Sequence, residues 1–159
     1  ARREAETEVL RSQLNEAKRA AADAAKRAAE VEAKQADRKL TDAQRATILE
    51  AIEPYPGQRV TLVVPLGDAD AYRYAKQFEH IFKEAKWEIT GGGIAQDVYT
   101  EPVPHGIFTA ISKALGDVHK APIGAGTFMK ALIELGLTKE GFSAPDVPDD
   151  NLFMRVGPK

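Results

Sequence analysis

Residues 91–105, GGGIAQDVYTEPVPH, join two segments that each have the pattern of a strand, a helix and a second strand. This connection holds three Gly and two Pro, so it cannot supply the crossover helix that usually joins parallel strands. Without a crossover helix, the strand before the connection and the strand after it most simply run antiparallel. The sequence therefore predicts an α+β domain with the ferredoxin-like βαββαβ arrangement.

The four predicted strands differ in the spacing of their apolar residues. Residues 59–65 and 106–113 are apolar on both faces, which is typical of central strands. Residues 87–90 and 152–156 alternate apolar and polar side chains, as edge strands do. A flavodoxin-like parallel four-stranded α/β sheet has the same two central strands, so it remains the alternative.

An amphipathic helix separates the strands of each unit. The first is expected to end at about Lys86 and the second to span about residues 122–135, both with a period near 3.6 residues. The tripeptide Leu-Gly-Asp precedes the first helix at residues 66–68 and follows the third strand at residues 115–117. We interpret the repeated loop as a structural device used twice.

The first third of the chain has a different composition. Residues 1–53 contain no Gly, Pro or aromatic residue, whereas every such residue lies after Glu53. Apolar residues recur there at alternating steps of four and three, which is the seam of a coiled coil. We expect residues 1–40 to form a helical stalk that self-associates, and residues 41–159 to form the globular domain. A single solvated helix is the alternative for the stalk. The seam positions are Leu10, Leu14, Ala17, Ala21, Ala24, Ala28 and Val31.

A second helix is predicted over residues 42–53. Thr41, two further residues and Gln44 match a capping box, in which each side chain bonds the other residue's backbone N–H. Ile48, Leu49 and Ile52 give this helix one apolar face, which we expect to pack on the sheet. An unbroken helix with a kink near Thr41 is the alternative.

Several functional classes are disfavoured by composition. The chain has no Cys, a net charge of −2 and no basic cluster among aromatic residues, so thiolate metal sites and nucleic-acid binding are not expected. The three His have no ligand spacing, and no Ser lies in a nucleophile elbow. We therefore expect no metal, no cofactor and no catalytic residue. The chain opens without Met in helical composition, which suggests a fragment whose upstream part holds a membrane anchor.

Two acidic residues follow the first strand in PLGDADAY, residues 65–72. Asp68 and Asp70 could bind Mg²⁺ or a phosphorylated group at the end of the sheet, with Lys113 as a partner. The interpretation we favour is structural, with Asp68 as the helix N-cap and Asp70 complementing the helix dipole.

The two long loops, residues 91–105 and 138–151, are the other candidate binding regions. Backbone N–H groups of Gly91, Gly92 and Gly93 could hold an anion, although a mobile loop explains them more simply. Tyr99 and His105 could line a pocket for a flat ligand.

A resemblance covers about residues 39–159. The runs LTDAQRATILEAI and GDADAYRYAKQFEHIFKEAKWEI, with the closing RVGPK, resemble the C-terminal soluble domain of uncharacterised bacterial membrane proteins. In that family, transmembrane helices and a helical linker precede a small α/β domain. The resemblance implies a domain tethered by a stalk on the cytoplasmic side of the bacterial inner membrane, or in the cytoplasm, and it implies no reaction.

The function expected from these features is non-enzymatic. The stalk would oligomerise, and the α/β domain would sense a ligand or bind a protein through its two long loops. The alternative is a Mg²⁺-dependent enzyme that acts on a nucleotide or phosphorylated substrate, with Asp68, Asp70 and Lys113 at one end of the sheet.

Overall fold

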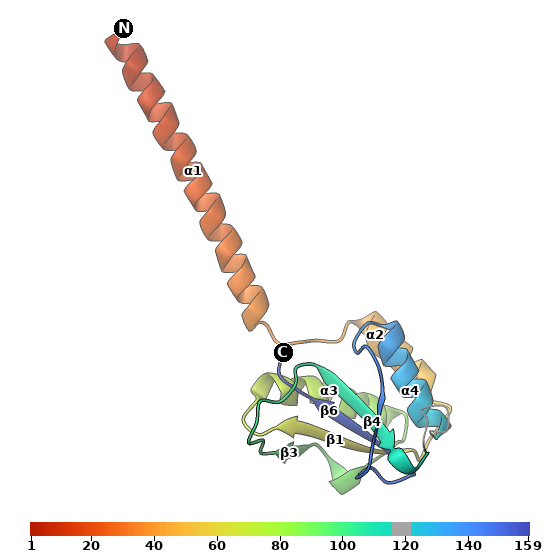
Figure 1. Cartoon of the computed structure of the whole chain (residues 1–159). Coiled ribbons are helices and arrows are strands. Elements are labelled where there is room, and N and C mark those ends of the chain that lie inside the picture. The colour runs from red at the N-terminus through yellow and green to blue at the C-terminus, as the bar shows by residue number, and fades with distance from the viewer. Residues whose placement is uncertain (116–121) are drawn as a thin grey trace. The chain divides into compact units, whose positions relative to one another are not determined.

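The computed structural model describes residues 1–115 and 122–159 (Figure 1). The chain divides into two units, Ala1–Ala36 and Asp37–Lys159. The first is a single helix, and the second is a mixed α/β unit. Gly116 and Asp117 of the second Leu-Gly-Asp loop lie outside the described residues.

Helix α1 (Arg2–Gln35) forms the first unit. Its large apolar side chains are exposed, with Leu10 at 65% and Leu14 at 55%. These residues occupy the predicted seam, so the seam faces solvent along the single chain. In the part of the chain that the structure describes, no helix has both the length and the apolar character needed to span a membrane.

Helix α2 (Asp42–Ile52) begins with the predicted capping box. The Thr41 hydroxyl accepts from the Gln44 backbone N–H at 3.1 Å, and the Gln44 side chain accepts from the Thr41 N–H at 2.9 Å. Ala36 is extended, with φ −61° and ψ 137°, so α1 ends there and the alternative of one kinked helix is wrong. Ile48 and Ile52 of α2 are fully buried in the core.

The sheet has the order β2-β1-β6-β4-β5, and β3 also pairs with β1. Strand β1 is parallel to β2, β3 and β6, whereas β4 is antiparallel to β6 and parallel to β5. The strand bounds are β1 (Arg59–Pro65), β2 (Glu88–Ile89), β3 (Ala95–Asp97), β4 (Ile107–Ser112), β5 (Phe142–Ala144) and β6 (Asn151–Val156).

The position of β6 differs from the prediction. It lies between β1 and β4 rather than at an edge, so the ferredoxin-like layout is not confirmed. The antiparallel pair β4–β6 also does not fit an all-parallel flavodoxin-like sheet. Apolar and polar side chains alternate along β6 because one set faces the helices and the other set faces away from them. A central strand covered on only one face therefore shows the same alternation as an edge strand.

Two parallel βαβ units flank β6. The first is β1, α3 (Ala69–Glu84) and β2, and the second is β4, α4 (Ile123–Glu134) and β5. The prediction that residues 152–156 close the second unit is therefore wrong. The closing strand is β5, whose three residues lie inside a segment that was expected to be loop.

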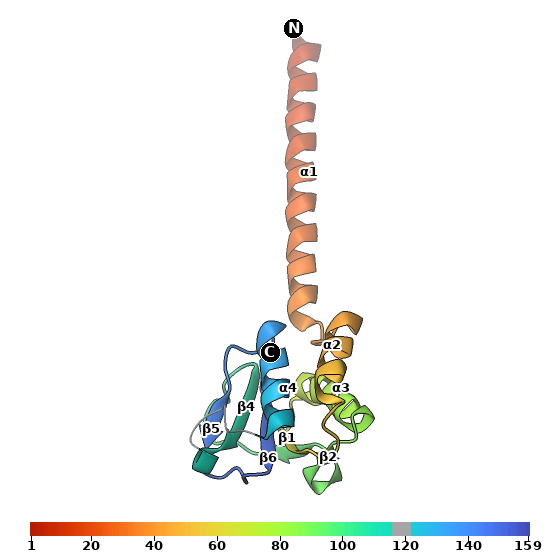
Figure 2. The same cartoon turned by 90° about the vertical axis from the view of Figure 1, so that its right-hand side faces the viewer.

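The three helices α2, α3 and α4 cover one face of the sheet. Val60, Leu62 and Val64 of β1 share one core cluster with side chains from all three helices. Figure 2 shows β4 and β5 on one side of α4, and α2 and α3 on the other. The Trp87 indole N–H donates to the carbonyl oxygen of Ile52 at 3.3 Å, which ties α2 to the start of β2. The opposite face of the sheet is left for loops and for a candidate site.

The capping box makes a stability prediction. Replacing Thr41 by Ala removes the acceptor for the Gln44 N–H and should lower the free energy of unfolding of the α/β unit by about 1 kcal/mol in urea. Thr47→Ala is the matched control, because the Thr47 hydroxyl only bonds the carbonyl of Ala43 within the exposed helix surface. Equal losses in the two variants would contradict the capping role.

Candidate functional site

The two acidic residues after β1 both have structural partners. Asp68 accepts from the backbone N–H of Ala71 at 2.9 Å and is the N-cap of α3. Asp70 accepts from the backbone N–H of Arg38 at 2.8 Å and from its Nε at 2.9 Å. Both carboxylates therefore already have structural roles at the start of α3.

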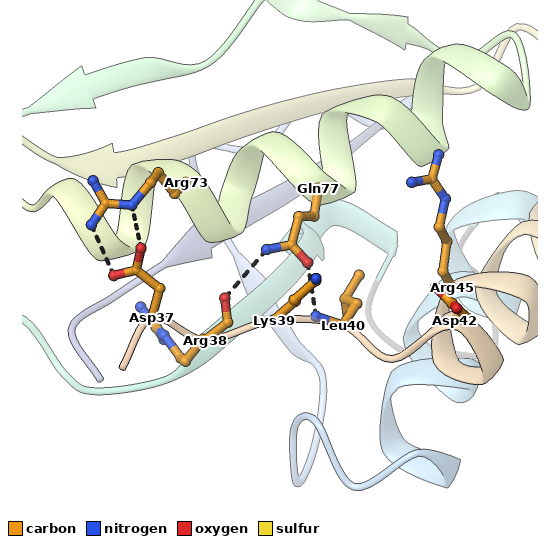
Figure 3. Close-up of a pocket in the computed structure, with 8 residues that line it drawn as sticks. All are labelled: Asp37, Arg38, Lys39, Leu40, Asp42, Arg45, Arg73 and Gln77. Carbon is orange, nitrogen blue, oxygen red and sulfur yellow. Dashed lines mark hydrogen bonds and ion pairs between the residues drawn. The ribbon is translucent and has the colours of Figure 1, made fainter. Parts of the chain in front are cut away.

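Residues 37–40, which we name the linker, run along α3 (Figure 3). The Gln77 side chain accepts from the backbone N–H of Leu40 at 2.7 Å and donates to the carbonyl of Arg38 at 3.2 Å. These two bonds satisfy backbone groups of a segment that belongs to no helix or strand. The linker is therefore fixed to the α/β unit by side chains of α3.

Ion pairs reinforce this attachment. The guanidinium of Arg38 is paired with Asp70, donates to the carbonyl of Gly157 at 2.7 Å and lies 4.9 Å from the centre of the Tyr74 ring. Asp37 accepts two hydrogen bonds from Arg73, and these bonds lower the pKa of Asp37 and raise the pKa of Arg73.

A polar pocket of about 370 Å³ lies beside the linker (Figure 3). Its lining includes Arg38, Arg73 and Arg45, and each of these is already in an ion pair, Arg45 with Glu84. Because a ligand would have to compete with these pairs, we assign the pocket a structural role.

Lys113 does not join the acidic residues. In the antiparallel pair β4–β6, Ile107 is opposite Val156, so Lys113 follows the end of β4 that lies nearest the start of β6. Strands β6 and β1 start together at the same end of the sheet, whereas Asp68 and Asp70 follow the far end of β1. The sheet topology thus places Lys113 and the two carboxylates at opposite ends, contrary to the arrangement expected for an enzyme.

Of the three consecutive glycines, only Gly93 lies close to a carboxylate. A Cβ at Gly93 would lie 3.7 Å from Oε2 of Glu79, whose side chain is buried. Burial acts to raise the pKa of Glu79, but Lys83 and Lys76 outweigh burial and lower it. Glu79 is ion-paired with Lys76 at 3.4 Å and with Lys83 at 3.2 Å, so its charge is already balanced within α3. Across residues 1–115 and 122–159, no group of three His, Asp or Glu could hold a metal ion.

The two long loops meet at a groove of about 610 Å³. Pro104 and His105 contribute from the first loop, and Phe108 and Arg155 from β4 and β6. From the second loop and the segment before it come Gly136, Leu137, Thr138, Lys139, Glu140 and Phe142. The groove therefore joins segments that are distant in sequence.

Hydrogen bonds hold the walls of the groove. The Thr138 hydroxyl donates to the carbonyl of Ile107 at 3.1 Å. The Gly106 N–H donates to the carbonyl of Pro158, and the Gly157 N–H donates to the carbonyl of Gly106. Nδ1 of His105 lies 2.5 Å from the carbonyl oxygen of Lys159. These contacts attach the segments on both sides of the groove to β4 and to the end of β6.

A row of flat side chains crosses the sheet on the face away from the helices. Phe108 is directly opposite Arg155 in the β4–β6 pair, and the Arg155 guanidinium lies 4.8 Å from the centre of the Phe108 ring. Phe142 of β5 stacks on Phe108, with ring centres 5.0 Å apart and an angle of 19° between planes. The register of three strands therefore builds this row of Phe142, Phe108 and Arg155.

Arg155 has aromatic neighbours but no carboxylate partner in the described part of the chain. No ion pair joins it to described residues, and its buried Nε has no hydrogen-bond partner there. The ring of Tyr99 lies 6.0 Å from the guanidinium. Leaving buried donors without partners is costly, so the site favours an anion that supplies acceptors.

The residues proposed from sequence divide into two groups. His105 lines the groove and Tyr99 contacts Arg155, whereas Asp68, Asp70, Gly91, Gly92, Gly93 and Lys113 are absent from the groove lining. Sequence reasoning missed Arg155, Phe108, Lys139 and Phe142. One feature of the sequence could have indicated Arg155: it is the single charged residue in the otherwise apolar run from Leu152 to Val156.

The linker attachment can be tested by proteolysis. Asp70→Asn should weaken the bonds to Arg38 and accelerate tryptic cleavage at Arg38 and Lys39 several-fold, because the linker must detach to be cut. Glu84→Gln, which loses only the exposed pair with Arg45, should leave the cleavage rate unchanged. Equal rates in wild type and Asp70→Asn would contradict the attachment.

Comparison of the chain with family models, curated proteins and solved structures gives no match. The resemblance to soluble domains of membrane-anchored proteins therefore stays a prediction.

Proposed function

We propose that this chain is a non-enzymatic binding module. Its α/β unit binds a ligand in the groove between the two long loops, and α1 joins copies of the chain. The observation that carries the proposal is Arg155, a guanidinium with no carboxylate partner among described residues, set in a groove that both loops line. Arg is well suited to bind planar anions because its donors form a rigid fork.

The competing enzyme has weaker support. Of its proposed residues, Asp68 and Asp70 follow one end of the sheet and Lys113 follows the other. Both carboxylates also already accept hydrogen bonds. A catalytic group must reach the reacting atoms within hydrogen-bond distance or through one water. This arrangement brings no such group to a common point.

Self-association through α1 is the second part of the proposal. The seam residues Leu10, Leu14 and Val31 are half or more exposed on the single helix. Each layer of Ala between them buries little apolar surface. Because burial contributes only ~0.8 kcal/mol per buried carbon, several layers must act together to hold the helices to each other. A second copy would cover these side chains with the same heptad pattern. A membrane tether upstream of Ala1 remains the implication of the resemblance.

The seam prediction concerns oligomeric state. The wild-type chain should sediment as an oligomer, and the double variant Leu10→Glu, Leu14→Glu should sediment as a monomer, because two seam layers would bury charge. Ser12→Glu lies off the seam and should leave the oligomer intact. A wild-type monomer with a disordered stalk would contradict self-association.

The groove prediction concerns ligand binding in general. In a titration of the ¹⁵N-labelled chain with a panel of small neutral and anionic fragments, binders should shift amides at Phe108, Lys139 and Arg155 saturably. Phe142→Ser should weaken these shifts, since it removes an exposed wall of the groove. Ile123→Ser removes an exposed apolar side chain elsewhere and is the control. Shifts confined to other surfaces would contradict the groove as the binding site.

A further inference from the structure

We infer that the ligand of the groove is a small aromatic monocarboxylate. This inference rests on the proposed binding function and names the chemical class that the site recognises. Three properties of the groove carry it: its charge, the surroundings of its donor, and its row of aromatic rings.

The charge of the lining matches a single negative charge. Arg155 and Lys139 are cationic and Glu140 is anionic, so the formal charge of these three side chains is +1. Arg155 is the cation held in place, since its guanidinium packs against Phe108. Lys139 is exposed at the rim, where its charge is screened by solvent. A monoanion on Arg155 therefore balances the groove.

The surroundings of the donor favour a carboxylate over a phosphate. An Arg fork forms parallel hydrogen bonds with two oxygens of either group. Phosphate sites usually add the N-terminus of a helix, but the lining here comes from strands, loops and the segment after α4. Gly136 and Leu137 follow the C-terminus of α4, whose carbonyl dipoles disfavour a dianion.

The aromatic row favours a flat apolar body on the ligand. Phe108 lies between Arg155 and Phe142, and the Phe142 side chain is still 42% exposed. A ligand ring packed across Phe108 and the exposed part of Phe142, at centre distances of about 4.5–7 Å, would leave its acid group on the Arg155 side of the row. A volume of about 610 Å³ accommodates one ring system with a short acid side chain.

Titration of the full ¹⁵N-labelled chain with phenylacetate tests the ligand class. The comparison compounds are 2-phenylethanol, which keeps the ring, acetate, which keeps the acid, and inorganic phosphate. Phenylacetate should shift the amides of Phe108, Phe142 and Arg155 saturably and bind at least ~10-fold more tightly than each of the three. Acetyl-Gly-Phe presents the same chemistry as the end of a peptide.

Variants separate the contributions of charge and ring. Arg155→Met should reduce phenylacetate binding to the level of 2-phenylethanol, and Arg155→Lys should restore only part of it because the fork is lost. If Arg155→Met fails to fold, Phe142→Ser provides the second test, since that side chain is partly exposed at an edge strand. Lys130→Met, on the exposed surface of α4, should bind phenylacetate like wild type.

The outcomes distinguish this inference from the proposed function. If 2-phenylethanol or phosphate binds the groove as tightly as phenylacetate does, the ligand class is wrong and the proposed binding function still holds. Tighter binding of acetyl-Gly-Phe than of phenylacetate overturns the small-molecule source in favour of a peptide end. Absence of groove shifts with every compound, the fragment panel included, overturns both.

Discussion

The position of β6 is the constraint on which the rest of the structure depends. Because β6 is parallel to β1 and antiparallel to β4, it joins two βαβ units into one sheet. Leu152, Met154 and Val156 point from it into the core beneath the three helices. The intervening Arg155 is thereby placed on the other face, opposite Phe108. One strand thus completes the core and supplies the cation of the groove.

The polar groups of the α/β unit fall into two kinds. Those at the start of α3 hold the chain together, since Asp68 caps the helix and Asp70, Arg73 and Gln77 bind the linker. In the described structure, Arg155 instead has rings rather than carboxylates around it. This difference between satisfied and unsatisfied charge, more than the size of either pocket, separates structural sites from the binding site we propose.

Local features of the fold could be predicted from sequence, and its non-local pairing could not. The Thr41–Gln44 capping box and the inner positions of β1 and β4 follow from short-range patterns, and the structure confirms them. Alternation in β6 could not distinguish an edge strand from a central strand covered on one face, and β5 is too short to have a strand pattern. Arg155 and Phe142 meet Phe108 only through strand pairing, so the groove escaped prediction although both loops around it were identified.

The most direct test of this account is an NMR measurement of intermolecular nuclear Overhauser effects between bound phenylacetate and the chain. The account predicts contacts from the ligand ring protons to the ring of Phe142, and from the ligand methylene to the side chain of Arg155. Contacts only to residues outside the groove, such as those of the linker pocket, would contradict the claim that β6 builds an anion-binding groove.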